Sequence, residues 1–221
     1  MVLICPICGE QLDIQGRSYV CPNRHSFDVA RQGYVNLLPV QQKHSQNPGD
    51  TREQVLSRRS FLEADFYAPI ARALIDTAKE MHAFGPILDI GCGEGYYSSR
   101  LAEHLGAELV GLDISKEAVR AAASRYKGPL WLCASAAHIP MVDHSVGLLT
   151  SLFAFTAPEE FKRVLKPDGT FIQVLAAQDH LLGLKSVIYP EVFRRQKDSV
   201  PQVEGFRLVR SIPVQFEFTV C

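Results

Sequence analysis

Residues 86–95 read Pro-Ile-Leu-Asp-Ile-Gly-Cys-Gly-Glu-Gly, and this stretch decides the fold. The apolar run at 87–90 predicts a buried strand that leads directly into a G-x-G-x-G loop, and a helix through about Leu105 follows. Glycines let the backbone turn sharply and pass close to a ligand, and the start of a helix offers free N–H groups. The stretch therefore predicts a strand, a ligand-binding loop and a helix at the start of an α/β sheet.

The spacing of the three glycines distinguishes two kinds of nucleotide cofactor. A dinucleotide fingerprint reads G-x-G-x-x-G and binds a pyrophosphate, whereas position 96 here is Tyr. A carboxylate two residues before the first glycine would repel a pyrophosphate and suits a ligand with an ammonium group. The next strand, at 108–113, ends in an acid about twenty residues beyond the loop, where a carboxylate accepts both ribose hydroxyls of an adenosine. These features favour S-adenosylmethionine, and the contacts they predict are Asp89, Gly91, Gly93, Gly95 and Asp113.

The rest of the chain alternates between helices and strands, as a doubly wound Rossmann-like α/β sheet does. Two helices precede the loop within residues 52–81, and Pro69 separates them. Small residues at 134–137 would line the adenine. After the loop the pattern predicts helices at 116–126 and 158–165, strands at 130–133, 146–153 and 170–175, and a turn at 166–169. Ligands in such sheets bind at the carboxyl ends of the strands, where the predicted contacts fall.

The N-terminal segment carries a second motif, C-x2-C-x12-C-x3-H, formed by Cys5, Cys8, Cys21 and His25. Tetrahedral Zn2+ needs four soft or borderline donors, and each closely spaced pair supplies two of them from one tight loop. A turn at 13–16 and alternation at 17–20 predict a β-hairpin between the pairs, as in a zinc ribbon or knuckle. A segment this short cannot bury enough apolar surface to fold alone, so we expect the zinc to be structural and its binding to be coupled to folding.

The composition of the 221 residues is that of a globular protein, with 47% hydrophobic and 21% charged residues. It excludes a disordered chain and a fibrous repeat. No apolar run approaches the roughly 18 residues of a membrane span, and no secretory signal opens the chain, so we expect a cytoplasmic location and no membrane partner. A formal charge of −1 gives no general support to nucleic-acid binding, so RNA contact requires a local basic patch. The candidates for that patch are Arg24, Arg31, Lys43, Arg58 and Arg59.

Two levels of resemblance follow from these motifs. The core resembles the class I S-adenosylmethionine-dependent methyltransferases in the segments 88–95, 111–115 and 165–169. The whole chain resembles more closely the bacterial RlmA-type 23S ribosomal RNA (guanine-N1)-methyltransferases. That second resemblance rests on the segments 5–8, 21–28, 33–39, 48–50 and 58–62.

The RlmA-type resemblance implies an activity, a partner and further site residues. Members methylate N1 of one guanosine in a hairpin loop of 23S ribosomal RNA near the peptide exit tunnel, and in some bacteria the related enzyme protects against macrolides such as tylosin. The resemblance also implies zinc binding by the four motif residues, RNA binding by the zinc domain, and a homodimer. The cofactor contacts that it adds to those above are Tyr67, Glu94 and His180.

A polar segment separates the zinc motif from the methyltransferase core. Residues 39–51 are rich in Gln, Asn, Pro and Gly, as linkers are. We expect a zinc-binding domain at 1–38, a linker at 39–51 and a methyltransferase domain at 52–221. Alternation over 205–221 predicts one last strand, whereas such sheets usually close with two, so we expect the C-terminal end of the sheet to be incomplete.

Two residues depart from the family pattern at positions expected to face the substrate base. Gly147 stands where methyltransferases often carry an Asp, and Phe155 stands where relatives have a Pro. Two alternatives to the ribosomal RNA enzyme therefore stay open. They are a methyltransferase that acts on another RNA or a small molecule, and a non-catalytic zinc-dependent RNA-binding protein with a degenerate core.

The catalytic residues are not identified by the sequence. Guanine N1 must lose a proton around methyl transfer, and the candidate acceptors are His138, Asp143 and His180. The target base must be unpaired or flipped out, and an aromatic side chain can then stack on it. The candidates for stacking are Tyr67, Phe153 and Phe155.

Overall fold

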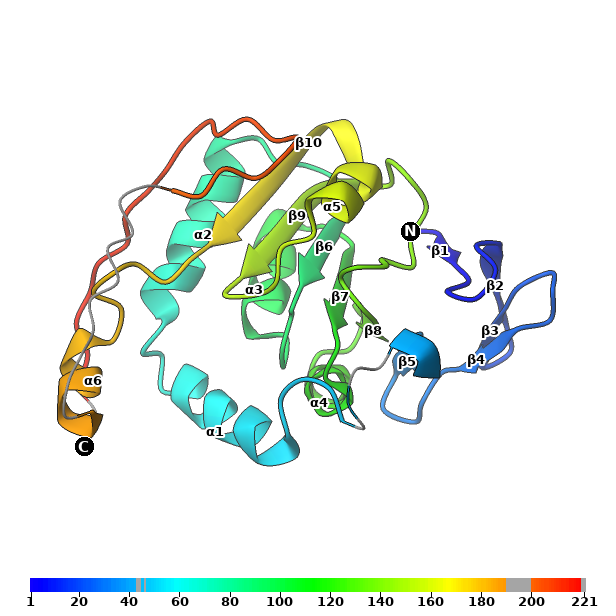
Figure 1. Cartoon of the computed structure of the whole chain (residues 1–221), viewed down its shortest axis with the longest axis horizontal. Helices are drawn as coiled ribbons and strands as arrows, with labels where there is room; N and C mark the ends of the chain where they lie inside the picture. The colour runs from blue at the N-terminus through cyan, green and yellow to red at the C-terminus, as the bar shows by residue number, and fades with distance from the viewer. Residues whose placement is uncertain (43–44, 46, 190–199, 220–221) are drawn as a thin grey trace.

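A parallel sheet with helices on both faces forms the centre of the computed structural model, which describes residues 1–42, 45, 47–189 and 200–219 (Figure 1). Its six strands lie in the order β10-β9-β6-β7-β8-β5, and each neighbouring pair is parallel. In that order they are Leu165–Val174, Val146–Leu152, Ile87–Ile90, Leu109–Asp113, Leu130–Cys133 and Tyr34–Asn36. The expected doubly wound α/β fold is confirmed.

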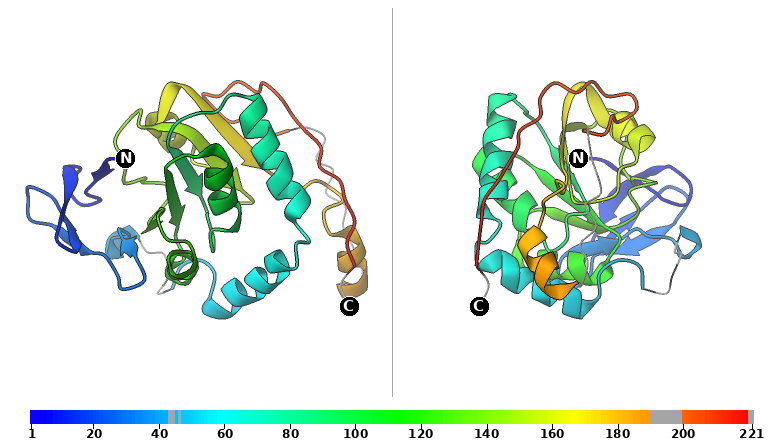
Figure 2. Two further views of the ribbon diagram at one scale, coloured as in Figure 1. Left: turned by 180° about the vertical axis from the view of Figure 1, so that it is seen from behind. Right: turned by 60° about the vertical axis from the view of Figure 1, so that its left-hand side comes forward.

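Successive residues of the central strands point to opposite faces of the sheet. Ile87 packs in the core that contains α2 (Ala68–Glu80), α3 (Tyr96–Leu105) and α4 (Lys116–Arg125). The left view of Figure 2 shows α2 and α3 in front of the sheet. Leu88 packs in a second core, together with α5 (Pro158–Val164) and the N-terminal segment. A strand covered on both faces needs apolar residues at consecutive positions, which explains the unbroken run at 87–90.

The N-terminal segment folds into a second, antiparallel sheet in the order β1-β2-β3-β4. These strands are Leu3–Ile4, Gln11–Gln15, Ser18–Val20 and Ser26–Asp28. The predicted hairpin is confirmed, but its turn lies at residues 16–17 because β2 continues through the expected turn. Leu3 forms an antiparallel bridge with Met141 in the β8–β9 loop, so the small sheet is joined directly to the large one.

Strand β5 lies within the segment expected to be the zinc-binding domain, yet it extends the central sheet. Tyr34 pairs with Trp131 and Asn36 with Cys133 of β8. The short helix η1 (Val40–Gln42) follows it. The domain boundaries at residues 38 and 51 stay a prediction.

Two helices precede β6, as the sequence predicts. Helix α1 (Arg52–Glu63) begins with a capping box in which the Thr51 hydroxyl accepts from the N–H of Gln54 and the Gln54 side chain accepts from the N–H of Thr51. Helix α2 begins at Ala68 with Pro69 in its first turn, where proline costs no hydrogen bond. One helix that the pattern did not predict, α6 (Leu182–Ile188), lies beyond β10.

The segment after residue 200 differs from the expectation. Its alternating apolar residues predict a strand, but residues 205–219 form none, and residues 220–221 lie outside the described residues. Phe216 and Phe218 instead pack edge-on against Tyr67, with ring centroids 5.9 and 6.0 Å apart. Among the described residues β10 is therefore an edge strand. No helix in the described ranges combines the length and apolar character that crossing a membrane requires.

Candidate functional site

The carboxyl ends of β6, β7 and β9 meet at one edge of the sheet, and α1 lies beyond that edge (Figure 1). The glycine loop follows β6 there. Gly91 has a φ of +69°, and a Cβ atom on it would lie 2.4 Å from the Cβ of Ala154, so no side chain fits. Gly93 has a φ of +56°, and a Cβ atom there would meet nothing within 4 Å. The loop therefore presents bare backbone to open space, as close approach by a ligand requires.

Asp113 ends β7 directly beside the glycine loop. Its carboxylate accepts from the N–H of Gly93 at 2.9 Å and from the N–H of Ser115 at 2.8 Å. Burial raises the pKa of Asp113, and these two donors act against that rise. The backbone N–H of Ala134 donates to the carbonyl oxygen of Asp113 at 3.0 Å, which brings the predicted adenine wall next to the acid. The arrangement therefore fits an adenosine, because a carboxylate that could accept ribose hydroxyls and small residues that could line the base adjoin the loop, and the contact of Asp113 with a cofactor stays a prediction.

Asp89 lies deeper, between β6, β9 and α3, with 3% of its surface exposed. Its two oxygens accept from the hydroxyls of Ser98 at 2.5 Å and Thr150 at 2.6 Å. Burial raises the pKa of this carboxyl to about 6 in spite of these hydrogen bonds. Because both oxygens have protein partners, the predicted contact of Asp89 with an ammonium group stays a prediction.

Glu94 is also buried, with 2% of its surface exposed, and sequence reasoning missed its partner. The Nε atom of Arg59 on α1 donates to its Oε2 at 2.8 Å, and the Arg125 guanidinium lies 3.8 Å from the same oxygen. The other oxygen, Oε1, is buried without a hydrogen-bond partner among the described residues. A contact between Glu94 and the cofactor stays a prediction. Gly95 follows Glu94 as the N-cap residue of α3.

These ion pairs change the interpretation of the basic patch. Arg59 binds Glu94, and Arg58 pairs with Asp50 at 2.7 Å. Both guanidinium groups are therefore engaged within the chain. Arg24 and Arg31 are exposed and have no ion pair within the described part of the protein, while Lys43 lies outside it.

An aromatic cluster lies at the carboxyl end of β9. The hydroxyl of Tyr67 and Nε2 of His180 are 2.8 Å apart, although the two residues are 113 positions apart in the chain. The His180 ring stacks on Phe153, with centroids 5.7 Å apart and an interplanar angle of 29°. The resemblance implies that Tyr67 and His180 contact the cofactor, and that role stays a prediction. The structure brings both residues together with Phe153, a candidate for stacking on the target base.

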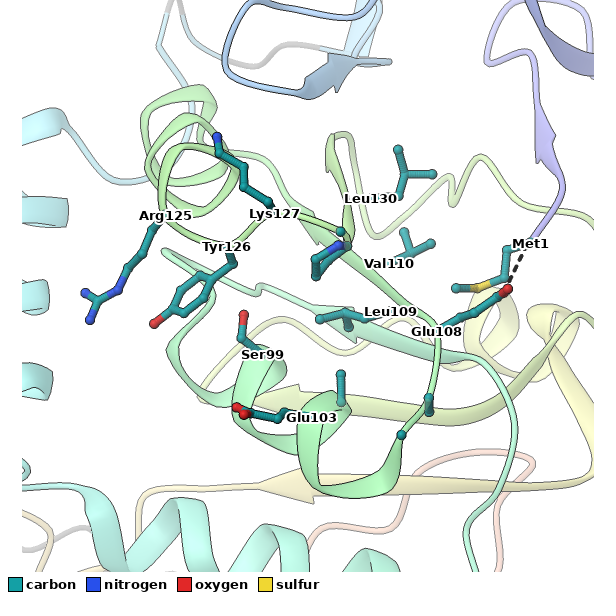
Figure 3. Close-up of a pocket in the computed structure, with 15 residues that line it drawn as sticks. Met1, Ser99, Glu103, Glu108, Leu109, Val110, Arg125, Tyr126, Lys127 and Leu130 are labelled. Atoms are coloured by element: carbon teal, nitrogen blue, oxygen red, sulfur yellow. Dashed lines mark hydrogen bonds and ion pairs between the residues drawn. The ribbon is translucent and has the colours of Figure 1, made fainter.

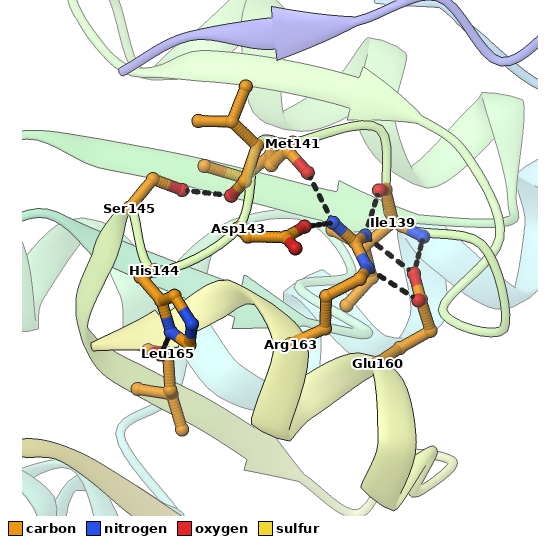
Figure 4. A network of polar contacts seen from close by, with 9 residues as sticks. Ile139, Met141, Asp143, His144, Ser145, Glu160, Arg163 and Leu165 are labelled. Carbon is orange, nitrogen blue, oxygen red and sulfur yellow. Dashed lines mark hydrogen bonds and ion pairs between the residues drawn. The ribbon is translucent and has the colours of Figure 1, made fainter. Parts of the chain in front are cut away.

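Two residues expected near the substrate base lie elsewhere. Gly147 is at the start of β9, where a Cβ atom would lie 2.1 Å from the carbonyl oxygen of Phe84, so its expected position facing the base is wrong. Asp143 precedes β9, and its carboxylate pairs with Arg163 at 2.8 Å (Figure 4). Strand β9 runs from this end toward the glycine loop, so both residues are at the opposite edge of the sheet. Phe155 does follow the carboxyl end of β9 and is 67% exposed.

Arg163 also holds the β8–β9 loop in place, as Figure 4 shows. Its guanidinium donates to the carbonyl oxygens of Ile139 and Met141, each at 2.7 Å, and to Glu160. Met141 is the residue that bridges to Leu3 of the small sheet. The network therefore fixes the loop on which the N-terminal sheet is mounted.

The four residues of the N-terminal motif converge as a metal site would. Their ligand atoms all lie within 4.8 Å of one another. The Sγ atoms of Cys8 and Cys21 are 3.7 Å apart, close to the edge of about 3.8 Å that Zn–S bonds of about 2.3 Å give in a tetrahedron. A hydrogen bond from Asn23 lowers the pKa of Cys8 to about 6, which favours the thiolate that binds zinc. The residues Cys5, Cys8, Cys21 and His25 therefore fit a closed four-ligand zinc site.

A pocket of about 710 Å³ lies at the other edge of the sheet, at the amino ends of β7 and β8 (Figure 3). Leu109, Leu130 and Tyr126 line it, and the amino group of Met1 pairs with Glu108 at its rim, at 3.5 Å. The residues that line it include none from the glycine loop or from the aromatic cluster.

The doubly wound sheet, the glycine loop and the acid that ends β7 together define a class I S-adenosylmethionine-dependent methyltransferase. Residues 88–173 match the family described as "Methyltransferase domain". A solved structure of an S-adenosylmethionine-dependent methyltransferase, described as putative, from Methanococcus maripaludis has the same fold. It aligns with a TM-score of 0.50 at 19% identity and covers 66% of this chain and 74% of its own.

Residues 3–46 match the family described as "RlmA, N-terminal", a zinc ribbon. A Bacillus subtilis (strain 168) protein named "Putative 23S rRNA (guanine-N(1)-)-methyltransferase YxjB" is 32% identical over 97% of this chain and 79% of its own length. The 23S rRNA (guanine(748)-N(1))-methyltransferase of Streptomyces fradiae is 37% identical over 82% of this chain and 66% of its own length. The chain therefore belongs to the RlmA-type family of 23S rRNA (guanine-N1)-methyltransferases.

Proposed function

We propose that this protein transfers a methyl group from S-adenosylmethionine to N1 of a guanosine in a hairpin loop of 23S ribosomal RNA. The observation that carries the proposal is the presence of a four-ligand zinc cluster and a glycine-loop site in one chain whose relatives are named for this activity. The relatives favour ribosomal RNA over another RNA, a small molecule or a purely binding role. We also propose that the protein acts in the cytoplasm, as a homodimer.

The residues assigned to each group follow from the geometry and the resemblance. Zinc is held by Cys5, Cys8, Cys21 and His25, and it stabilises the N-terminal sheet without taking part in the reaction. The residues assigned to the cofactor are Tyr67, Asp89, Gly91, Gly93, Glu94, Gly95, Asp113 and His180. Asp113 would accept the ribose hydroxyls, and the bare backbone at Gly93 would allow the methionine portion to lie against the loop.

Bound S-adenosylmethionine supplies a methyl group that is already strongly electrophilic. The protein therefore has to align the guanine with that methyl group and exclude water, rather than activate the methyl donor. Phe153 and Phe155 are exposed at the end of β9 and can stack on a guanine that has left its base pair. Arg24 and Arg31, on the zinc-binding segment, are exposed, and we assign the phosphate contacts of the proposed basic patch to them.

Primer extension on 23S ribosomal RNA from cells with and without the protein tests the proposal. Methylation of N1 blocks the pairing edge, so we expect a reverse-transcription stop at one guanosine only when the protein is present. Identical stops in both RNAs would rule out the proposed activity. Binding of S-adenosylhomocysteine, measured by calorimetry, then distinguishes an enzyme with another substrate from a protein that has lost its cofactor site.

A further inference from the structure

The aromatic cluster at the end of β9 contains one of the three candidate proton acceptors for guanine N1 methylation. The N1 atom carries a proton at neutral pH, and that proton must leave as the methyl group arrives. Asp143 is paired with Arg163 at the opposite edge of the sheet, and His138 is exposed in the β8–β9 loop. Of the three candidate acceptors, His180 is the one that lies within the cluster.

We propose that His180 is the general base of the reaction and that Tyr67 orients its imidazole. This inference rests on the proposed function. The N1–H bond breaks and its proton goes to Nδ1 of His180. The electron pair of that bond forms the N1–methyl bond, and the pair of the sulfur–methyl bond stays on the sulfur of S-adenosylhomocysteine. The positive charge of the sulfonium is replaced by that of the imidazolium, so the step is balanced.

The proposed role requires the tautomer of His180 in which Nε2 carries the ring proton and donates to Tyr67. The Tyr67 hydroxyl lies 2.8 Å from Nε2 of His180. When Nε2–H donates to this hydroxyl, Nδ1 keeps a free lone pair and the ring cannot rotate away. A base held by a third group in this way is the usual arrangement in general-base catalysis. In the proton transfer Tyr67 is therefore a positioning residue, because it acts on that step through His180.

The charges around His180 keep its imidazole neutral. Burial lowers the pKa of His180, and the nearby Lys185 of α6 lowers it further. Burial raises the pKa of Tyr67, which therefore stays a neutral phenol at physiological pH. Phe153 contributes no charge. Tyr67 from the start of α2 and Lys185 from α6 are the titratable groups that act on His180 among the described residues.

The backbone of Phe153 places its ring against the imidazole of His180. Its φ of +54° lies in the left-handed region, which a bulky residue adopts only under strain. That conformation ends β9 and turns the ring toward His180, against which it stacks. The ring is still 40% exposed. Phe153 therefore supports the imidazole from one face, while the cluster stays open to solvent for an incoming base.

The test is the pH dependence of single-turnover methylation by His180→Gln and His180→Ala, with saturating S-adenosylmethionine and a 23S ribosomal RNA hairpin. We expect the wild-type rate to rise through the pKa of His180 and then level off. Each variant should be slower by about 10²–10⁴-fold at pH 7. The rates of the variants should rise about tenfold per pH unit into the alkaline range, since hydroxide replaces the base, and added imidazole should partly rescue His180→Ala.

Three controls separate this role from the alternatives. His138→Gln, at an exposed histidine, should leave the profile unchanged. Tyr67→Phe keeps the ring but loses the hydroxyl, so its rate should fall less than that of His180→Gln while the pKa in the profile shifts. Because S-adenosylmethionine is saturating, a weaker cofactor Kd in His180→Gln should not account for its loss of rate. A His180→Gln enzyme with the wild-type profile, or one whose whole loss follows a weaker cofactor Kd, would overturn the proposal. A wild-type protein that makes no N1-methylguanosine would instead overturn the proposed function.

Discussion

The Nε atom of Arg59 donates a hydrogen bond to Oε2 of Glu94 across 2.8 Å and so joins α1 to the glycine loop. Glu94 is 2% exposed, whereas the Arg59 side chain is 26% exposed. A buried carboxylate loses its hydration, and it stays ionised at low cost only while its cationic partner is present. The conformation of the loop is therefore coupled to the position of α1.

Replacement of Arg59 by methionine should destabilise the protein by about 3 kcal/mol, because it leaves the buried Glu94 charge with only the more distant Arg125. Urea unfolding measures this loss. The double variant Arg59→Met, Glu94→Gln should regain most of it, since the amide carries no charge.

The matched control is Arg58→Met on the same helix. Arg58 is 56% exposed and pairs with the partly exposed Asp50, so its loss should cost less than about 1 kcal/mol. Equal losses at both arginines, or no recovery in the double variant, would show that burial of Glu94 does not depend on Arg59.

Removal of zinc should destabilise the whole chain rather than the N-terminal sheet alone. Cys5 and Cys21 pack in the same core as Leu88 and Val110 of the central strands. Loss of the metal should lower the melting temperature by on the order of 10 °C, given a loss of about 3–5 kcal/mol. The readout is the fluorescence of Trp131, the single tryptophan of the chain, which lies on β8.

Zinc added back after chelation should restore the transition, and magnesium should not, because thiolate and imidazole donors favour zinc. If Trp131 reported the same transition with and without chelator, the small sheet would be energetically independent of the large one.

The central strands were predictable because their signal is local. The run at 87–90, the glycine loop and the acid of β7 are each defined within a few residues, and the structure places them where the pattern predicts. Strand β5 was not predicted as part of the sheet. Three residues show no periodicity, and the partner strand β8 begins only at Leu130, so nothing near Tyr34–Asn36 marks the pairing.

Two predictions were wrong because a local sequence pattern does not show which distant residues a segment contacts. Alternation of Phe216 and Phe218 predicts a strand, but an apolar residue at every second position serves aromatic packing on Tyr67 equally well. The adjacent Arg58 and Arg59 were predicted to belong to one basic patch. Successive helical residues point in different directions, and these two arginines pair with different acids. The zinc ligands were predictable because two short spacings already confine all four donors.

The stability of the protein should fall with pH across the range in which Asp89 ionises. Its pKa is raised from the model-compound value of 3.8 to about 6, so the folded state binds this proton more tightly than the unfolded state does. The stabilisation from the bound proton is therefore complete below about pH 4 and is lost as the pH rises through 6. A shift of this size corresponds to about 3 kcal/mol.

The difference in unfolding free energy between wild type and Asp89→Asn isolates this contribution. Measured by urea unfolding from pH 4 to pH 7, the difference should change by up to about 3 kcal/mol, with the wild type losing stability relative to the variant. Ser98 and Thr150 can both remain bonded in the variant because hydroxyl rotors adapt to an amide. A difference that stays constant across this range would mean that Asp89 does not titrate there.

The cofactor role of Asp113 leads to a different prediction, because ionisation of this group should favour binding rather than oppose it. Ribose hydroxyls donate to a carboxylate more strongly than to a carboxylic acid, so the affinity for S-adenosylhomocysteine should fall when acid protonates Asp113. Burial raises the pKa of this group, so the fall should begin at a higher pH than for an ordinary aspartate.

Asp113→Asn should raise the Kd by about 10–100-fold, which corresponds to the loss of charge-assisted hydrogen bonds worth about 1.5–3 kcal/mol. Calorimetry measures both effects, and Asp143→Asn at the opposite edge of the sheet is the control that should bind normally. Equal affinity in Asp113→Asn and wild type would assign the carboxylate only to its contacts with Gly93 and Ser115.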